Sequence, residues 1–284
     1  MNKKAAGDHL QSEQNEAASA LFDVRDRVVV ITGGLGQLGT RFAGALLRQG
    51  ARVALLDVGE PGVGHAAMLG GGRARYFHGD VTDRASIECA LAAIENVWGA
   101  PYGLINNAAL DSPPGAAASE NLPFERFPAD VWDRTMDVNV KGVFQCCQVM
   151  GEAMCEAGRG SVINVCSIYG LVSPDQRLYE YRREQGEPFY KPISYTASKS
   201  ALLGMTRYLA TYWAGRGVRV NTLTLGGVFN NQDPRFLERY VERVPLGRMA
   251  DPDEYNGAVV FLMSDASLYM TGGNMVMDGG WTAW

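Results

Sequence analysis

The chain has 284 residues, a length that suits one large α/β unit, and 46% of them are hydrophobic while 20% are charged. Its net charge of −5 excludes the lysine/arginine stripe that a nucleic-acid-binding surface needs. No run approaches the roughly 18 apolar residues of a membrane span, and the first twenty residues lack the apolar stretch of a signal peptide. We therefore expect a cytoplasmic protein with neither a nucleic acid nor a membrane as partner.

The five cysteines point to a reduced compartment. Their number is odd, and none of them forms a CxxC pair. A disulfide scaffold or a zinc knuckle needs cysteines paired at short spacings. The sequence thus predicts free thiols and no bound metal ion.

Strands and helices are expected to alternate along the chain after a polar tail. Residues 1–22 form the predicted flexible tail, and 23–284 a single domain. Short apolar runs predict strands at 27–32, 51–57, 73–80, 102–109, 160–167, 218–225 and 273–280. Longer segments with a helical apolar period predict helices at 42–50, 83–99, 129–158, 193–215 and 251–265.

The strands are expected to be buried on both faces, because runs such as VVVI, VALL and VINV show no polar alternation. Strands of this kind, alternating with crossover helices, make a doubly wound sheet. The predicted fold is therefore α/β and Rossmann-like, with a mostly parallel, seven-stranded sheet and helices on both faces. Residues 172–192 break the alternation with a polar, aromatic and charged connection, which at this length is usually functional or disordered.

A glycine motif, TGGLGQLG at 32–39, follows the first strand and opens the first helix. Gly33, Gly36 and Gly39 have the spacing that lets a backbone approach a pyrophosphate at a helix N-terminus. Glycine trios also occur in simple turns, but the strand–turn–helix context favours nucleotide binding. We assign Gln37 and Leu38, inside the motif, to the same cofactor site.

Two acidic residues end neighbouring strands. Asp57 lies 18 residues after Gly39, where a carboxylate accepts hydrogen bonds from the adenosine ribose and repels a 2′-phosphate. This favours NAD over NADP; the alternative is a solubilising turn aspartate. Asp80 and Val81 end the third strand, where the adenine edge is expected, although an aspartate here also suits a helix-capping turn.

Tyr195 and Lys199 share one face of a predicted helix, because they are spaced i, i+4. A tyrosine is a poor base at its ordinary pKa of about 10, and a nearby ammonium favours the phenolate. Only five of the 26 cationic residues are lysines, which draws attention to Lys199. The alternative is a surface lysine beside a packed tyrosine.

From about residue 26 to its end, the chain resembles the short-chain dehydrogenase/reductase family. The segments that carry the resemblance are TGGLGQLG, Asp57, GDV at 79–81, NNAA at 106–109, NV at 139–140, Ser167 in VCSIYG, YTASK at 195–199 and the terminal DGGW. The resemblance implies hydride transfer between a nicotinamide cofactor and a carbinol or carbonyl carbon.

The resemblance also implies roles for individual residues. Tyr195 is the implied general acid/base and Ser167 the residue that holds the substrate oxygen. Lys199 is implied to bind the nicotinamide ribose and to lower the tyrosine pKa, and Asn139 to anchor a water that relays protons. Further cofactor contacts are implied for Asn107, Ala108 and Val228.

The sequence departs from the family pattern in three places. Gln37 stands where the single-domain branch has glycine, and NNAA replaces the usual NNAG. Gly226 stands where the family generally has proline, which puts the shape of the loop over the nicotinamide in doubt.

The spacing of 28 residues between Ser167 and Tyr195 reflects the segment 172–192, which we expect to lie over the active site. Candidate substrate contacts are Tyr169, Arg177, Asn230 and Asn231. The arginines suit a phosphate or carboxylate, so a sugar-derived substrate, anionic or a neutral polyol, is predicted; alternatively they pair with nearby glutamates. GEPFYKP, GGVFNNQ and GGWTAW are similar to dehydrogenases of bacterial surface-sugar and flagellin-glycan pathways.

Apolar residues on more than one face of the helices at 140–154 and 201–212 predict self-association. The resemblance implies a homotetramer, with a dimer as the alternative. Two other functions stay open: an NAD-dependent sugar-nucleotide epimerase, and an NAD-binding regulatory protein.

Overall fold

The computed structural model describes residues 20–111 and 118–284. The predicted tail at 1–22 lies almost wholly outside them. Its last residue, Phe22, packs its ring against Phe261, with the centroids 6.5 Å apart. Packed chain therefore begins before Asp23, where the domain was predicted to start.

Within the described residues, seven strands form one parallel sheet in the order β3-β2-β1-β4-β5-β6-β7. The strands are β1 Val28–Thr32, β2 Arg52–Asp57, β3 Ala74–His78, β4 Gly103–Asn106, β5 Gly160–Ser167, β6 Val218–Leu225 and β7 Asn274–Met277. Every residue of β1, β4 and β6 is buried. The predicted Rossmann-like, doubly wound sheet is confirmed.

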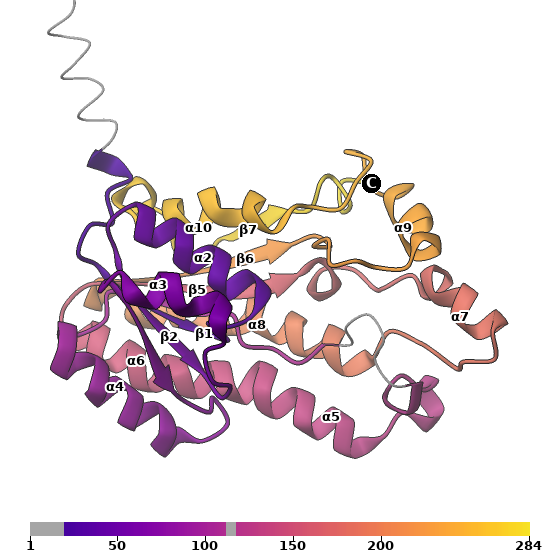
Figure 1. The fold of residues 1–284 in the computed structure, drawn as a ribbon, viewed down its shortest axis with the longest axis horizontal. Coiled ribbons are helices and arrows are strands. Elements are labelled where there is room, and N and C mark those ends of the chain that lie inside the picture. Colours follow the sequence, from indigo (N-terminus) through magenta and orange to yellow (C-terminus); the bar gives the residue numbers. More distant parts are fainter. Residues whose placement is uncertain (1–19, 112–117) are drawn as a thin grey trace, which may run out of the picture.

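Helices cover both faces of the sheet, with α2 and α10 on one face and α4, α6 and α8 on the other (Figure 1). The helices are α2 Gln37–Arg48, α3 Ala66–Gly70, α4 Arg84–Trp98, α5 Ala129–Met136, α6 Val143–Glu156, α7 Glu180–Glu184, α8 Ile193–Trp213, α9 Pro234–Val241 and α10 Asn256–Met263. In the part of the chain that the structure describes, no helix is long and apolar enough to cross a membrane.

Two apolar cores result. Phe42 and Leu46 of α2 and Leu262 of α10 pack in one, and Met150 of α6 and Trp213 of α8 pack in the other. Side chains from both faces of the strands complete them, which explains why the strand sequences do not alternate with polar residues.

The helices differ from the prediction in three ways. The predicted helix at 129–158 is interrupted by a π-helical segment, Asp137–Gly142, between α5 and α6. The first helix begins at Gln37 instead of 42, because Gly36 takes the extended N-cap conformation. The short helices α3, α7 and α9 were not predicted, since each is too brief for apolar periodicity to reveal it.

The strand order reverses direction between β1 and β4, which lie side by side although β2 and β3 separate them in sequence. In open parallel sheets this switch point leaves a crevice outside the carboxyl ends of the strands. Helices α7 and α9 lie beyond that edge, at the right of Figure 1. The fold therefore gathers β1, β4, β5 and β6 around one crevice.

Gly151 on α6 tests the packing between α6 and α8. A Cβ at Gly151 would lie 2.3 Å from Cη2 of the Trp213 ring, so Gly151→Ala forces this buried contact apart. We expect a loss of about 1–3 kcal/mol in the free energy of unfolding, measured by urea denaturation at fixed protein concentration. Gly44→Ala in α2 is the control: its nearest neighbour is the Arg48 side chain, 3.4 Å away, so a gain of about 0.5–1 kcal/mol is expected. Equal effects of both variants would contradict the predicted packing.

Candidate active site

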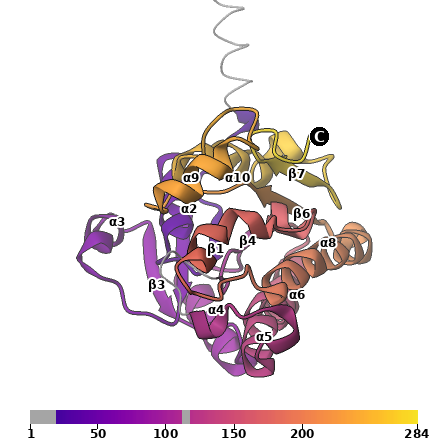
Figure 2. The same cartoon turned by 90° about the vertical axis from the view of Figure 1, so that its right-hand side faces the viewer.

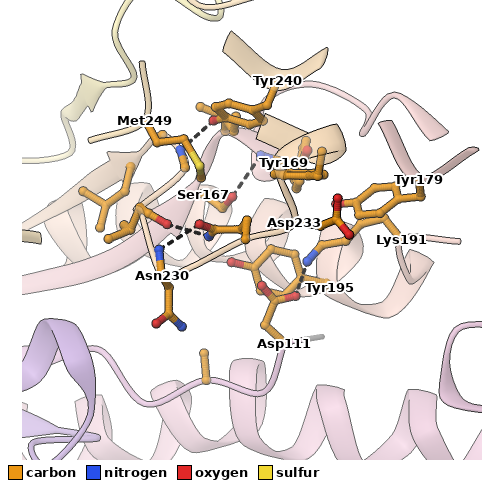
Figure 3. A pocket seen from close by; sticks show the side chains of 18 of the residues that line it. Asp111, Ser167, Tyr169, Tyr179, Lys191, Tyr195, Asn230, Asp233, Tyr240 and Met249 are labelled. Carbon is orange, nitrogen blue, oxygen red and sulfur yellow. Dashed lines mark hydrogen bonds and ion pairs between the residues drawn. The ribbon is translucent and has the colours of Figure 1, made fainter. Parts of the chain in front are cut away.

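A cavity of about 590 Å³ lies at the crevice and is lined by residues from the strand ends, the segment 172–192 and α9. Figure 3 shows Ser167, Tyr195 and Asn230 around it, with Tyr169, Tyr179 and Tyr240 along its wall. Nine of the predicted site residues line it: Gln37, Leu38, Asn107, Ser167, Tyr169, Tyr195, Lys199, Val228 and Asn230. The nucleotide motif and the predicted catalytic residues thus meet in one space.

The glycine motif forms a tight turn between β1 and α2. Gly33 has a positive φ of 60°, and a Cβ there would lie 2.9 Å from Cα of Ala108. A Cβ at Gly39 would lie 2.3 Å from the carbonyl oxygen of Gly33, so only glycine fits this position. Together with Gly36 as N-cap, the turn presents the first N–H groups of α2. Such N–H groups have no partner within the helix and suit a phosphate.

Asp57, at the end of β2, supports this turn. Its Oδ2 accepts a hydrogen bond from the Leu35 N–H at 3.0 Å, and its Oδ1 accepts one from the Gly59 N–H at 3.0 Å. A carboxylate has lone pairs for further donors. Asp57 is therefore more than a solubilising residue, and its position beside the glycine turn suits contact with a ribose.

Asp80 and Val81 have different environments. Oδ1 of Asp80 accepts hydrogen bonds from the N–H and the hydroxyl of Thr82, at 2.8 and 2.7 Å, so Asp80 stabilises a local turn. The N-cap of α4 is Asp83 and not Asp80. Val81 is buried, and its carbonyl oxygen accepts a hydrogen bond from Nε2 of Gln145 at 2.9 Å. Neither residue lines the cavity at the catalytic end.

Asn107 and Ala108 fasten β4 to β1. The Asn107 side chain donates to the carbonyl oxygens of Thr32 and Gly33, at 3.1 and 3.0 Å. The Ala108 N–H donates to the Thr32 hydroxyl at 3.0 Å. These bonds fix the floor of the crevice, and Asn107 still lines the cavity.

Tyr195 and Lys199 of α8 line the same cavity as Ser167, the last residue of β5, and Figure 3 shows Tyr195 and Ser167 around it. The Lys199 ammonium is buried, donates to the Val165 carbonyl oxygen at 2.9 Å and lies 5.8 Å from the centre of the Tyr195 ring. Oγ of Ser167 accepts a hydrogen bond from the Tyr169 N–H at 3.2 Å.

The ionisation of this pair differs from the expectation. Burial raises the pKa of Tyr195 well above its usual value, the charge of Asp111 raises it further, and a hydrogen bond with Ser167 opposes them. Burial also lowers the pKa of Lys199. Desolvation of the phenolate is therefore the largest influence on the pKa of Tyr195 in this structure, and the lowering of that pKa by Lys199 stays a prediction.

Asn139 lies in the π-helical segment and joins three parts of the site. Its Nδ2 donates to the Leu110 carbonyl oxygen at 2.9 Å and to the Ser198 hydroxyl at 3.0 Å, and its Oδ1 accepts from the Leu110 N–H at 2.7 Å. Irregular π turns are frequent at functional sites. The segment thus ties the chain after β4 to α8; the water-anchoring role stays a prediction.

The loop after β6 closes over the cofactor end of the cavity. Nε2 of Gln37 donates to the Phe229 carbonyl oxygen at 3.1 Å, which links the glycine turn to this loop. The Gly226 N–H donates to the Met277 carbonyl oxygen at 2.8 Å. Proline has no N–H for this bond, so the departure from the family pattern at Gly226 has a structural reason.

The segment 172–192 folds against α9 as predicted for a cover of the site. Leu178 is buried in an aromatic cluster with Phe236 and Tyr240. The buried Phe189 reaches this cluster through Tyr179, whose ring centre lies 5.2 Å from that of Phe189 and 5.5 Å from that of Phe236. Asp175 forms an ion pair with Arg243, next to this cluster. Aromatic packing and a charge pair therefore hold the segment down.

The arginines of segment 172–192, called the insert below, differ in position: Arg182 lines the cavity and Arg177 does not. Arg177 pairs with Asp175, at 2.8 Å, and does not line the cavity, which corrects its predicted substrate contact. Arg182 lies over the Phe189 ring and pairs with Glu187 at 2.6 Å, as the alternative interpretation expected of that glutamate. Asn231 is also absent from the lining; it takes a positive φ of 53° in the turn after Asn230.

Sequence analysis missed several lining residues, notably Asp111, Lys191, Tyr240 and Met249. The Tyr240 hydroxyl accepts a hydrogen bond from the Gly227 N–H at 2.7 Å. The usable signals were an aspartate two residues after NNAA and one of only five lysines near the end of the segment 172–192.

Comparison with known proteins agrees with this geometry. Residues 36–282 match the family model described as Enoyl-(Acyl carrier protein) reductase. The chain is 34% identical to a D-threitol dehydrogenase of Mycolicibacterium smegmatis, over 95% of this chain and 98% of that protein. It is 35% identical to the 2-(S)-hydroxypropyl-CoM dehydrogenase 3 of Xanthobacter autotrophicus, over 92% of this chain and 98% of that protein.

Among solved structures, a short-chain dehydrogenase from Leptospira borgpetersenii with bound NAD+ superposes with a TM-score of 0.80. It is 34% identical, and the match covers 92% of this chain and 94% of that chain. The chain belongs to the short-chain dehydrogenase/reductase family. It is an oxidoreductase that acts on a CH–OH group with NAD or NADP, and the epimerase alternative is not favoured.

Proposed function

We propose that the protein is an NAD-dependent dehydrogenase that oxidises a secondary hydroxyl of a neutral polyol or sugar-derived alcohol, or reduces the corresponding ketone. The observation that carries the proposal is the convergence of Ser167, Tyr195 and Lys199 in one cavity with the glycine turn. A regulatory protein without catalysis has no need of this trio at the strand ends.

The residues present fit a dinucleotide, because the tight Gly33–Gly39 turn, in which a Cβ at either end would meet backbone atoms, leads directly into the N-terminus of α2. A bound nicotinamide would supply the acceptor for the hydride of the carbinol carbon. Ser167 holds the substrate oxygen, and Tyr195 removes or returns the proton on that oxygen. Lys199 binds the ribose and places a positive charge beside the tyrosine. Tyr195 and Lys199 therefore serve both cofactor and substrate.

The substrate class follows from the charges that line the cavity. Arg182 and Arg235 pair with Glu187 and Asp233, at 2.6 and 2.8 Å. A phosphate or carboxylate on the substrate would have to displace a carboxylate from its arginine. This favours a neutral, hydroxyl-rich molecule, in keeping with the threitol dehydrogenase among the relatives. The likeness to surface-sugar pathways stays a prediction.

Replacing the tyrosine tests the proposed chemistry. Purified protein with NAD and a panel of polyols, aldonates, sugar phosphates and nucleotide sugars should form NADH, measured by absorbance, from polyols above all. Tyr195→Phe should lower kcat by at least about 100-fold while NAD binding is kept. If the protein binds NAD but oxidises none of these alcohols, the proposal is contradicted.

The pH profile of the same assay has a definite sign. The raised pKa of Tyr195 leaves the phenol dominant at neutral pH. Oxidation needs the phenolate, so kcat/KM for the alcohol should rise with pH, by up to about tenfold per unit. Reduction of the ketone needs the phenol, so it should stay level and then fall at high pH. Oxidation that slows from pH 7 to pH 9 would contradict this assignment.

Asp57 supports the preference for NAD, because its carboxylate suits ribose hydroxyls and repels a 2′-phosphate. Asp57→Ser is expected to lower the ratio of kcat/KM with NAD to kcat/KM with NADP by about 10–100-fold. The ratio serves as its own control, since damage to the glycine turn through Leu35 or Gly59 affects both cofactors alike. An unchanged ratio would mean that Asp57 only supports the turn.

We also propose that the protein assembles as a homotetramer, with a dimer as the alternative. Tyr208 and Tyr212 of α8 are 66% and 63% exposed and stack at 5.8 Å, and Phe144 of α6 is 48% exposed. Figure 2 shows α6 and α8 as neighbours on one side of the molecule. Aromatic groups exposed together mark an association surface. Sedimentation equilibrium at micromolar concentration should show an assembly of four chains. The double variant Tyr208→Glu/Tyr212→Glu should form a smaller species. A monomeric wild type would overturn the proposed assembly.

A further inference from the structure

A second lysine reaches the cavity beside the predicted catalytic tyrosine. Lys191, the residue before Pro192 at the start of α8, is 7% exposed and lines the cavity. Its ammonium lies 4.6 Å from the centre of the Tyr195 ring and 5.9 Å from that of Tyr169. The hydride-transfer chemistry of Ser167, Tyr195 and Lys199 assigns no task to this group.

The backbone of Lys191 is held in place by one side chain of the insert. Nε2 of Gln176 donates to the Lys191 carbonyl oxygen at 3.0 Å, and the Lys191 N–H donates to Oε1 of Gln176 at 2.8 Å. This two-point contact resembles the pairing of adjacent strands. The insert therefore fixes the start of the lysine side chain and limits the directions it can take.

Asp111 meets the lysine from the other side of the cavity. It follows β4 by five residues, and its Oδ1 accepts a hydrogen bond from Nζ of Lys191. The aspartate side chain is 42% exposed, whereas that of the lysine is 6% exposed. Figure 3 shows the pair directly beside the Tyr195 ring. The two charges come from segments 80 residues apart and meet only at the reaction centre.

We propose that Lys191 and Asp111 form a polar clamp that binds a second hydroxyl of the substrate, next to the carbon that reacts at Tyr195. The inference rests on the proposed function and narrows it to alcohols with a neighbouring hydroxyl, such as vicinal diols and linear polyols. Neither residue exchanges a proton or an electron with the substrate in this role.

The chemistry of the pair suits a hydroxyl better than other groups. An ammonium has three N–H donors, and one carboxylate oxygen takes only part of that capacity. A hydroxyl both donates and accepts, so it bonds a lysine and an aspartate at once. An anionic group would meet the Asp111 charge, and an apolar group would leave the buried ammonium poorly solvated. The clamp therefore selects against substrates that lack the second hydroxyl.

Two alcohols that differ by one hydroxyl test the clamp. We would measure kcat/KM at saturating NAD for 2,3-butanediol and for 2-butanol, with threitol as a longer polyol. Lys191→Met should lower kcat/KM for the diol and for threitol by about 10–100-fold, and change the value for 2-butanol by less than about threefold. Asp111→Asn keeps the side-chain shape and should move the same ratio in the same direction.

Lys141→Met is the matched control. Lys141 also pairs with an aspartate, Asp137, at 3.4 Å, but on an exposed helix surface outside the cavity. The control should leave the diol-to-alcohol ratio unchanged. Circular dichroism and NAD binding would establish that each variant is folded.

The outcomes separate the clamp from the proposed function. A selective loss on the diol and threitol supports the clamp. An equal loss on both alcohols means that the pair acts through Tyr195 or the fold, and an unchanged ratio means that it does not touch substrate; either overturns the clamp while the dehydrogenase remains. Failure of the wild type to oxidise any alcohol overturns the proposed function, and the clamp with it.

Discussion

The parallel direction of all seven strands is the constraint on which the site depends. In a parallel sheet every strand ends at the same edge, so side chains that follow β1, β4, β5 and β6 meet there whatever their distance in sequence. Thr32, Asn107 and Ser167 are such residues, and the bonds of Asn107 to the backbone of β1 fix their relative positions. The burial of the sheet on both faces holds the edge rigid, which a precise hydride transfer requires.

The parts of this site that could be read from the sequence are those whose geometry is local. Gly33 and Gly39 are six residues apart and form one turn, while Tyr195 and Lys199 are one helical turn apart, so spacing alone places them together. The strands were readable because burial on both faces removes polar residues from them. Asn139 was found by its family motif, but its π-helical setting was not, since a single extra residue in a turn leaves no periodic trace.

Contacts between distant segments account for what was missed. Arg177 was expected at the substrate because arginines suit anions. Its guanidinium instead donates hydrogen bonds to Asp175, two residues away. The partner of Lys191 is Asp111, and no local sequence pattern predicts this contact. Tyr240 entered the cavity because α9 folds back over the insert, where Arg239 pairs with Glu180. Charge pairing over long separations depends on the final fold, which composition and spacing do not encode.

Lys191 of the insert and its partner Asp111 both act electrostatically on Tyr195. Two ammonium groups, of Lys191 and Lys199, lie within 6 Å of the Tyr195 ring centre, a setting that by itself favours the phenolate. Asp111 accompanies Lys191, and its charge together with burial raises the tyrosine pKa instead. Burial, the larger cause, and the charge of Asp111 thus both favour the protonated tyrosine, and the same aspartate accepts a hydrogen bond from the ammonium of Lys191 beside it.

The protonation state of Tyr195 affects which direction of the reaction is ready to begin. A tyrosine kept as phenol is ready to protonate a carbonyl oxygen, whereas oxidation must begin from the minor phenolate form. A substrate hydroxyl bound between Lys191 and Asp111 would share the aspartate's charge through a hydrogen bond and weaken its effect on the phenol. A hydroxyl in the proposed clamp would thus contact one of the charges that raise the tyrosine pKa, while burial, the larger cause, would remain.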